Sequence, residues 1–147
     1  MHDLVGTWRL IDWTVTMRSG RVTRPFRGKA TGSITYTNEG RMVATLMKAD
    51  RERIGTRTLN EATAFERGTA AAGYLSYAGT YEIIDDQVHH QVELSLFPDW
   101  VGGVQIRHIT WIKNGDGTTD LELSDRGSNN HGAAIMRLTW HRITEDR

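Results

Sequence analysis

Alternation of apolar and polar residues runs through most of the chain and predicts β-strands. The first long segment of this kind extends from Thr7 to Met17, and its phase changes near Leu10 and Ile11, where we expect a bulge. Comparable alternating segments follow at 32–37, 41–47, 79–84, 88–97, 105–113, 118–124 and 133–143. The pattern predicts about eight strands, joined by turns rich in glycine, asparagine and aspartate.

One segment, 48–77, breaks this alternation. Thr58-Leu59-Asn60-Glu61 matches a helix capping box, and small or apolar residues then recur at helical spacing as far as Leu75. Gly68 and Gly73 each weaken such a helix by about 1 kcal/mol relative to alanine. We therefore expect a single short helix, at about 58–76.

The lengths of the connections predict how the strands are arranged. Tight turns at 38–40, 85–87 and 114–117 alternate with long connections at 18–31, 48–77, 98–102 and 125–132. In an up-and-down meander, alternate connections lie at the same end of the sheet. The order predicts an all-β, eight-stranded antiparallel up-and-down barrel, with a closed floor and an open end that the helix and the long loops cover.

Short motifs along the chain resemble those of a known family. They are Gly6-Thr7-Trp8, Gly40-Arg41-Met42, Gly79-Thr80-Tyr81-Glu82 and His90-x-x-Glu93-x-Ser95-x-x-Pro98-x-Trp100-x-Gly102. Together they resemble the bacterial lipocalin-like domain family, a calycin-like β-barrel with a Gly-x-Trp motif. The resemblance implies one domain over 1–147, with Trp8 closing the floor and Arg142 of the last strand beside it. The segment 48–77 departs from secreted lipocalins, which place their helix after the barrel.

Charge and composition limit which partners and cofactors we expect. The 18 basic and 18 acidic residues leave a net charge of zero, so we expect neither nucleic acid nor an anionic membrane as a partner. We find no signal segment and no apolar run that could span a bilayer, and cytoplasmic localisation is the default. The chain lacks cysteine, and its adjacent His89 and His90 point to opposite faces. Only His90 and His108 share a plausible surface, so we expect no metal and no cofactor.

The candidate site lies where the strands at 88–97 and 105–113 meet across Pro98 and a glycine pair. If Phe97 faces Gly103, then Glu93 lies opposite Arg107. This polar face could point to solvent or into the lumen, and we favour the lumen because aromatic residues share it. An outer face of valine, leucine and isoleucine would then need cover, for example in a homodimer. The predicted catalytic residues are Glu93 and Arg107, and the predicted ligand-binding residues are Tyr36, Tyr81, His89, Gln91, Ser95, Gln105, Trp100, Trp111 and His131.

Three functions remain open on this basis. The first is a binding protein that holds a small, largely apolar molecule with a polar or acidic head in its lumen. The second is a cofactor-independent isomerase, cyclase or lyase, in which Glu93 moves a proton and Arg107 stabilises an oxyanion. The third is a dimeric structural or interaction protein with a filled barrel. An open lumen would separate the first two from the third.

Overall fold

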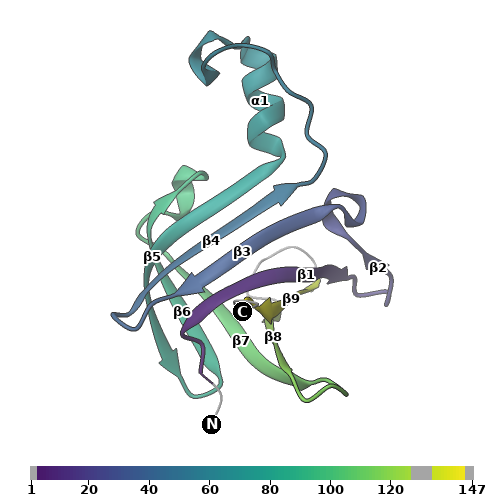
Figure 1. The fold of residues 1–147 in the computed structure, drawn as a ribbon, viewed down its shortest axis with the longest axis vertical. Coiled ribbons are helices and arrows are strands. Elements are labelled where there is room, and N and C mark those ends of the chain that lie inside the picture. The colour runs from purple at the N-terminus through teal and green to yellow at the C-terminus, as the bar shows by residue number, and fades with distance from the viewer. Residues whose placement is uncertain (1–2, 127–133, 145–147) are drawn as a thin grey trace.

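Nine strands of the computed structural model form one antiparallel sheet that closes on itself (Figure 1). The structure describes residues 3–126 and 134–144. The sheet order is β2-β1-β3-β4-β5-β6-β7-β8-β9, and an additional pairing of β1 with β9 closes an eight-stranded barrel, to which the short β2 adds an edge. The strands are β1 (Gly6–Thr16), β2 (Val22–Thr23), β3 (Ala30–Tyr36), β4 (Arg41–Lys48), β5 (Tyr74–Ile84), β6 (Gln87–Ser95), β7 (Val104–Lys113), β8 (Thr119–Arg126) and β9 (Ile135–Arg142). The predicted all-β barrel is confirmed.

The two ends of the barrel differ as the connection lengths predict. Short turns at 37–40, 85–86 and 114–118 join strands at one end, the floor. The connections at 17–29, 49–73 and 96–103 lie at the other end, the mouth, and they contain the 3-10 turns η1 (Pro25–Gly28), η2 (Leu59–Glu61) and η3 (Pro98–Trp100). The predicted loop residue His131 lies outside the described residues.

The predicted bulge in the first strand is also present. Leu10 pairs with Trp140 of β9, whereas Asp12 pairs with Thr139, so Ile11 has no partner of its own. A bulge of this kind bends and twists a strand, which lets one long strand pair with both β3 and β9.

The floor is closed by Trp8, which is buried and donates its indole N–H to the carbonyl of Leu4 at 2.9 Å. The guanidinium of Arg142 lies 4.1 Å from the centre of the Trp8 ring and donates to the carbonyls of Val5 and Asp3, both at 2.6 Å. The expected pairing of Trp8 with Arg142 is confirmed, and it seals one end of the lumen.

The helix α1 (Ala64–Ala72) is shorter than predicted and begins later. Its capping box is formed by Thr63 and Glu66, whose side chains each accept a hydrogen bond from the other's backbone N–H. The predicted box at Thr58 is wrong, because Thr58 makes no cap bond and a 3-10 turn at Leu59–Glu61 follows it. No residue of α1 is buried, so the capping box, and not packing against the barrel, determines where the helix begins.

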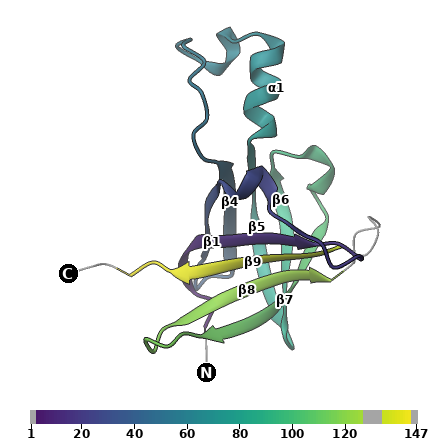
Figure 2. The ribbon, with the colours of Figure 1, turned by 90° about the vertical axis from the view of Figure 1, so that its right-hand side faces the viewer.

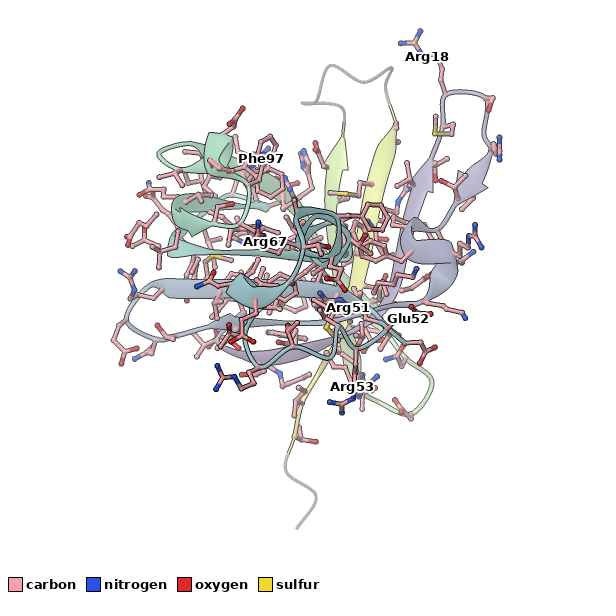
Figure 3. All side chains as sticks on the ribbon, turned by 90° about the horizontal axis from the view of Figure 1, so that it is seen from above. Arg18, Arg51, Glu52, Arg53, Arg67 and Phe97 are labelled. Carbon is pink, nitrogen blue, oxygen red and sulfur yellow. The ribbon has the colours of Figure 1, made fainter. Side chains whose placement is uncertain are left out.

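The segment 49–73, which we call the arm, projects from the mouth. Figures 1 and 2 show α1 rising beyond the ends of β4 and β5, and Figure 3 shows the arm from above. Phe65 of the helix is 84% exposed, and no arm residue lines the cavity described below. The helix is at the predicted end of the barrel, but it stands above the mouth and contributes nothing to the cavity wall.

Candidate functional site

The turn between β5 and β6 decides which residues of β6 face the lumen. It contains only Asp85 and Asp86, so Ile84 pairs with Gln87 and Tyr81 pairs with His90. The predicted three-residue turn at 85–87 would instead place Gln91 opposite Tyr81. A slip of one residue moves every side chain of a strand to the opposite face. His90 therefore points inward, and its neighbours along the strand point outward.

The pairing of β6 with β7 also differs from the prediction. His90 pairs with Gln105 and Val88 pairs with Arg107, whereas we expected Glu93 opposite Arg107. Regular pairing between the strands ends at Gln91 and Val104. Beyond it, the N–H of Val92 donates to the carbonyl of Gly103 at 3.0 Å and its carbonyl accepts from the N–H of Gly102 at 2.9 Å, at the base of the loop that contains η3. The last residues of β6 continue along β5 alone, where Ser95 pairs with Tyr77.

Glu93 lies outside the barrel. The pairing of β5 with β6 shifts register here, because Gly79 pairs with Val92 and Ala78 with Leu94, so Glu93 has no partner on β5. At Gly79 the Cβ of any other residue would lie 1.8 Å from the carbonyl oxygen of Gln91. The half-exposed carboxylate of Glu93 accepts a hydrogen bond from the guanidinium of Arg41 at 2.8 Å. The predicted ion pair between Glu93 and Arg107 in the lumen is therefore wrong, and Glu93 cannot reach a molecule held there.

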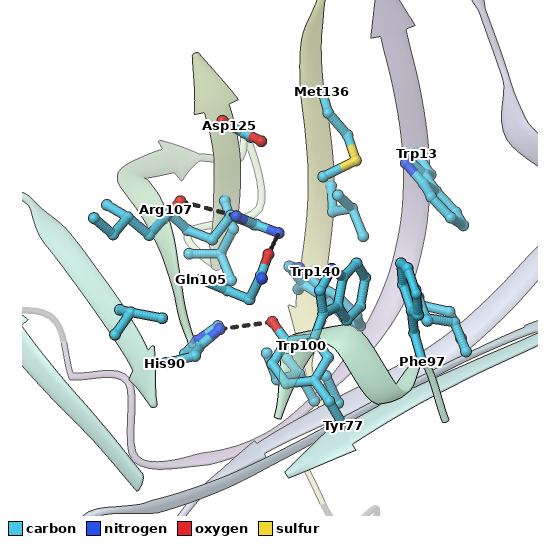
Figure 4. A pocket seen from close by; sticks show the side chains of 18 residues that line it. Trp13, Tyr77, His90, Phe97, Trp100, Gln105, Arg107, Asp125, Met136 and Trp140 are labelled. Atoms are coloured by element: carbon cyan, nitrogen blue, oxygen red, sulfur yellow. Dashed lines mark hydrogen bonds between the residues drawn. The ribbon is translucent and has the colours of Figure 1, made fainter. Parts of the chain in front are cut away.

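A cavity of about 630 Å³ occupies the barrel between the floor and the mouth (Figure 4). This volume is in the range of cavities that hold drug-sized molecules. Its wall is mostly apolar, and five aromatic residues and four polar ones contribute to it. The aromatic residues are Trp13, Tyr77, Phe97, Trp100 and Trp140, and the polar ones are His90, Gln105, Arg107 and Asp125.

Arg107 supplies a positive charge to this wall. Its guanidinium donates to the side-chain oxygen of Gln105 at 3.1 Å and to the backbone carbonyl of Ile106 at 2.9 Å. Both acceptors are neutral, and within the described ranges no carboxylate forms an ion pair with Arg107. An anionic group that enters the cavity can accept charge-assisted hydrogen bonds from this guanidinium, although the carboxylate of Asp125 lies on the same wall.

His90 is the most deeply buried polar residue of the site. Its Nε2 lies 2.7 Å from the hydroxyl of Tyr36, and its Nδ1 lies 2.7 Å from the hydroxyl of Tyr77. Burial lowers the pKa of His90 to about 3, and the positive charge of Arg107 adds to the effect. Burial also raises the pKa of both tyrosines. The three groups are consequently neutral near pH 7.

Comparison with known proteins identifies the family. A family model for a lipocalin-like domain matches residues 5–143. The chain belongs to the lipocalin-like domain family. Among solved structures, a crystal structure of an uncharacterized protein from Bacteroides eggerthii DSM 20697 is similar, at 14% identity and a TM-score of 0.47, over 95% of this chain and 100% of that one. No curated protein matches the chain.

In this lipocalin-like barrel, three of the predicted site residues reach the cavity, namely Gln105, Arg107 and Trp100. Tyr36 lies behind the wall, where it bonds His90. Ser95, on the face of Tyr77, accepts a bond from the backbone N–H of Phe97 and so shapes the mouth loop.

Four other predicted residues lie elsewhere. His89 and Gln91 point away from the lumen, where their side chains bond those of Gln87 and Thr80. Tyr81 donates its hydroxyl to the carbonyl of Thr37 near the floor. Trp111 packs against Trp8 and lines a separate hollow of about 280 Å³ below the floor. His89 and Gln91 point outward because of the one-residue slip. Tyr81 and Trp111 miss the cavity because they lie too close to the floor.

Three residues of the cavity wall, His90, Tyr77 and Asp125, were not predicted as site residues. The sequence did carry a signal for His90, because aspartate tolerates the left-handed conformation that two-residue hairpin turns require. Asp85 adopts this conformation, with a φ of 55°. Reading Asp85-Asp86 as such a turn places His90 inward. The described ranges contain no group of three acidic or histidine side chains that could hold a metal ion, and no helix there is long and apolar enough to cross a membrane.

Proposed function

We propose that the barrel binds a small, largely apolar molecule in its lumen and holds an anionic head group, such as a carboxylate, against Arg107. The observation that carries this proposal is the guanidinium of Arg107, which lies on the wall of a mostly apolar cavity of about 630 Å³ without a carboxylate partner in the described ranges. Family membership supports small-molecule binding in general, and the head group is inferred from the wall itself.

The apolar part of the ligand would pack against aromatic and aliphatic side chains. Trp13, Trp140 and Leu138 line the cavity from β1 and β9, and Trp100 lies at the mouth, in edge contact with the ring of Tyr77. Each buried methylene of a ligand contributes about 0.8 kcal/mol. An acyl chain of moderate length could therefore supply most of the binding free energy, and Arg107 would supply the preference for its head group.

The proposal is tested by comparing decanoate with 1-decanol, which differ in the charge of the head group. Binding is followed by the fluorescence of the tryptophans that line the cavity. We expect wild type to favour decanoate by about tenfold or more, because hydrogen bonds to charged groups contribute about 1.5–3 kcal/mol. Arg107→Gln should abolish this preference but still bind 1-decanol.

Arg41→Gln is the matched control, because Arg41 is an arginine on the outside of the barrel, paired with Glu93. It should leave the preference for decanoate unchanged. An equal preference in wild type and Arg107→Gln, or no binding of either compound, would contradict the proposal.

The alternative functions receive less support. The isomerase, cyclase or lyase hypothesis relied on Glu93 as the acid–base group, and Glu93 lies outside the barrel. The cavity of about 630 Å³ gives no support to the filled barrel of the third hypothesis. A homodimer and a cytoplasmic location stay predictions, which sedimentation of the purified protein and fractionation of cells would test.

A further inference from the structure

Tyr36, His90 and Tyr77 form a row of hydrogen bonds in which each group must act either as donor or as acceptor. Both ring nitrogens of His90 are bonded to a tyrosine hydroxyl. A neutral imidazole carries one N–H donor and one acceptor nitrogen. One tyrosine must therefore donate to His90, and the other must accept from it. The accepting tyrosine keeps its own O–H proton for a different partner.

The surroundings of Tyr36 decide which arrangement holds. Tyr36 is 1% exposed, does not line the cavity, and among the described residues its hydroxyl bonds only His90. If Nε2 carried the proton, the O–H of Tyr36 would be buried without an acceptor. A buried donor left unpaired disfavours that arrangement by roughly a factor of five to a hundred.

The surroundings of Tyr77 are different, because Tyr77 lines the cavity. Its O–H proton can reach water or a ligand when its oxygen accepts a bond from His90. The hydrogen bonds are also cooperative, since an oxygen that accepts a bond polarises its own O–H and makes it a better donor.

We infer that His90 carries its proton on Nδ1 and thereby fixes the hydroxyl of Tyr77 as a hydrogen-bond donor to an uncharged acceptor oxygen of the ligand, such as a ketone carbonyl. This inference deepens the proposed function and rests on it. Arg107 and Tyr77 line the same cavity. In this arrangement Arg107 binds the charged head group, and Tyr77 donates to a neutral oxygen. The ligand class is thus an apolar acid that carries a second, neutral oxygen acceptor along its skeleton.

The tautomer is measured first, and without any ligand. In protein labelled with ¹⁵N-histidine, the ring nitrogens of His90 are observed by NMR at pH 7 and assigned by their absence in His90→Gln. The expected result is a protonated Nδ1 and an unprotonated Nε2. A protonated Nε2 would overturn the inference, whatever the protein binds.

The donor role of the Tyr77 hydroxyl is measured with two neutral probes, butyrophenone and butylbenzene, in which a carbonyl of the first replaces a methylene of the second. Tyr77→Phe should reduce the affinity for butyrophenone relative to butylbenzene by about fivefold, the value of one neutral hydrogen bond. Tyr81→Phe is the control, since its hydroxyl bonds Thr37 and does not line the cavity. It should leave the ratio unchanged.

Two failures can be told apart. If both probes bind and Tyr77→Phe keeps the wild-type ratio, the donor role is wrong although the proposed function stands. If wild type binds neither these probes nor decanoate, the proposed function is wrong, and the inferred role of Tyr77 toward a ligand is overturned with it.

Discussion

His90 is enclosed between two tyrosine hydroxyls, and at the scale of single residues this burial makes stability depend on pH. The folded-state pKa of His90 is about 3, against 6.5 for an ordinary histidine. Below pH 6.5 the unfolded chain binds a proton that the folded barrel does not take up until about pH 3. The free energy of unfolding should therefore be unaffected by His90 above pH 6.5 and should fall as the pH drops from 6.5 to 3.

The size of this effect follows from the shift. Each pKa unit corresponds to about 1.4 kcal/mol, so His90 should cost the folded state roughly 2 kcal/mol between pH 7 and pH 5. Urea unfolding of wild type and His90→Gln at the two pH values measures it. We expect the decrease in wild type to be larger than the decrease in His90→Gln by about that amount. Equal decreases would show that His90 does not exclude its proton.

At the scale of secondary-structure elements, the arm at 49–73 leaves and rejoins the sheet at residues that lie side by side. The pairing of β4 with β5 continues to Met47 and Tyr74, and the N–H of Lys48 donates to the carbonyl of Gly73 at 2.9 Å. The two ends of the arm are thus as close as the ends of a hairpin turn. No residue of α1 is buried, so the helix adds little packing to the rest of the molecule.

We predict that replacing 49–72 with Asn-Gly, a favoured two-residue hairpin turn, leaves the barrel folded. The variant should keep the strand signal in circular dichroism and bind decanoate within about threefold of wild type, because no arm residue lines the cavity. The same experiment tests whether the arm covers a bound ligand. A large gain in the rate of decanoate release, without loss of fold, would show that it does.

The elements themselves were predictable because each depends on local signals. Alternation identified the strands, and the contrast between short turns and long connections identified the floor and the mouth. The site was less predictable because it depends on register. Alternation has a period of two, so it is equally compatible with His90 or Gln91 facing inward, and one residue of turn length decides between them. The same slip places Glu93 outside. The bulge opposite Gly79, which alternation does not reveal, then returns Ser95 to the face of Tyr77.

At the scale of the whole molecule, the barrel combines a sealed floor with an open lumen. Trp8 and Arg142 close one end, while Phe97 and Trp100 at the other end leave a cavity between the sheet's inner faces. The side chains around such a cavity lack partner atoms on one side, so the empty barrel loses contacts that a filled one would have. Binding of a ligand that fills the lumen should therefore raise the stability of the entire sheet.

We predict that decanoate at a hundred times its dissociation constant stabilises the barrel by about 2.7 kcal/mol, since it binds the folded state alone. For a chain of this size that corresponds to a rise in Tm of roughly 5–10 °C. Ala44→Trp, which adds an indole to the cavity wall, should abolish the rise, whereas Phe65→Ser, on the exposed helix of the arm, should preserve it. The reverse pattern would place the bound molecule on the arm and leave the lumen without a ligand, because the rise in Tm follows the site that is occupied.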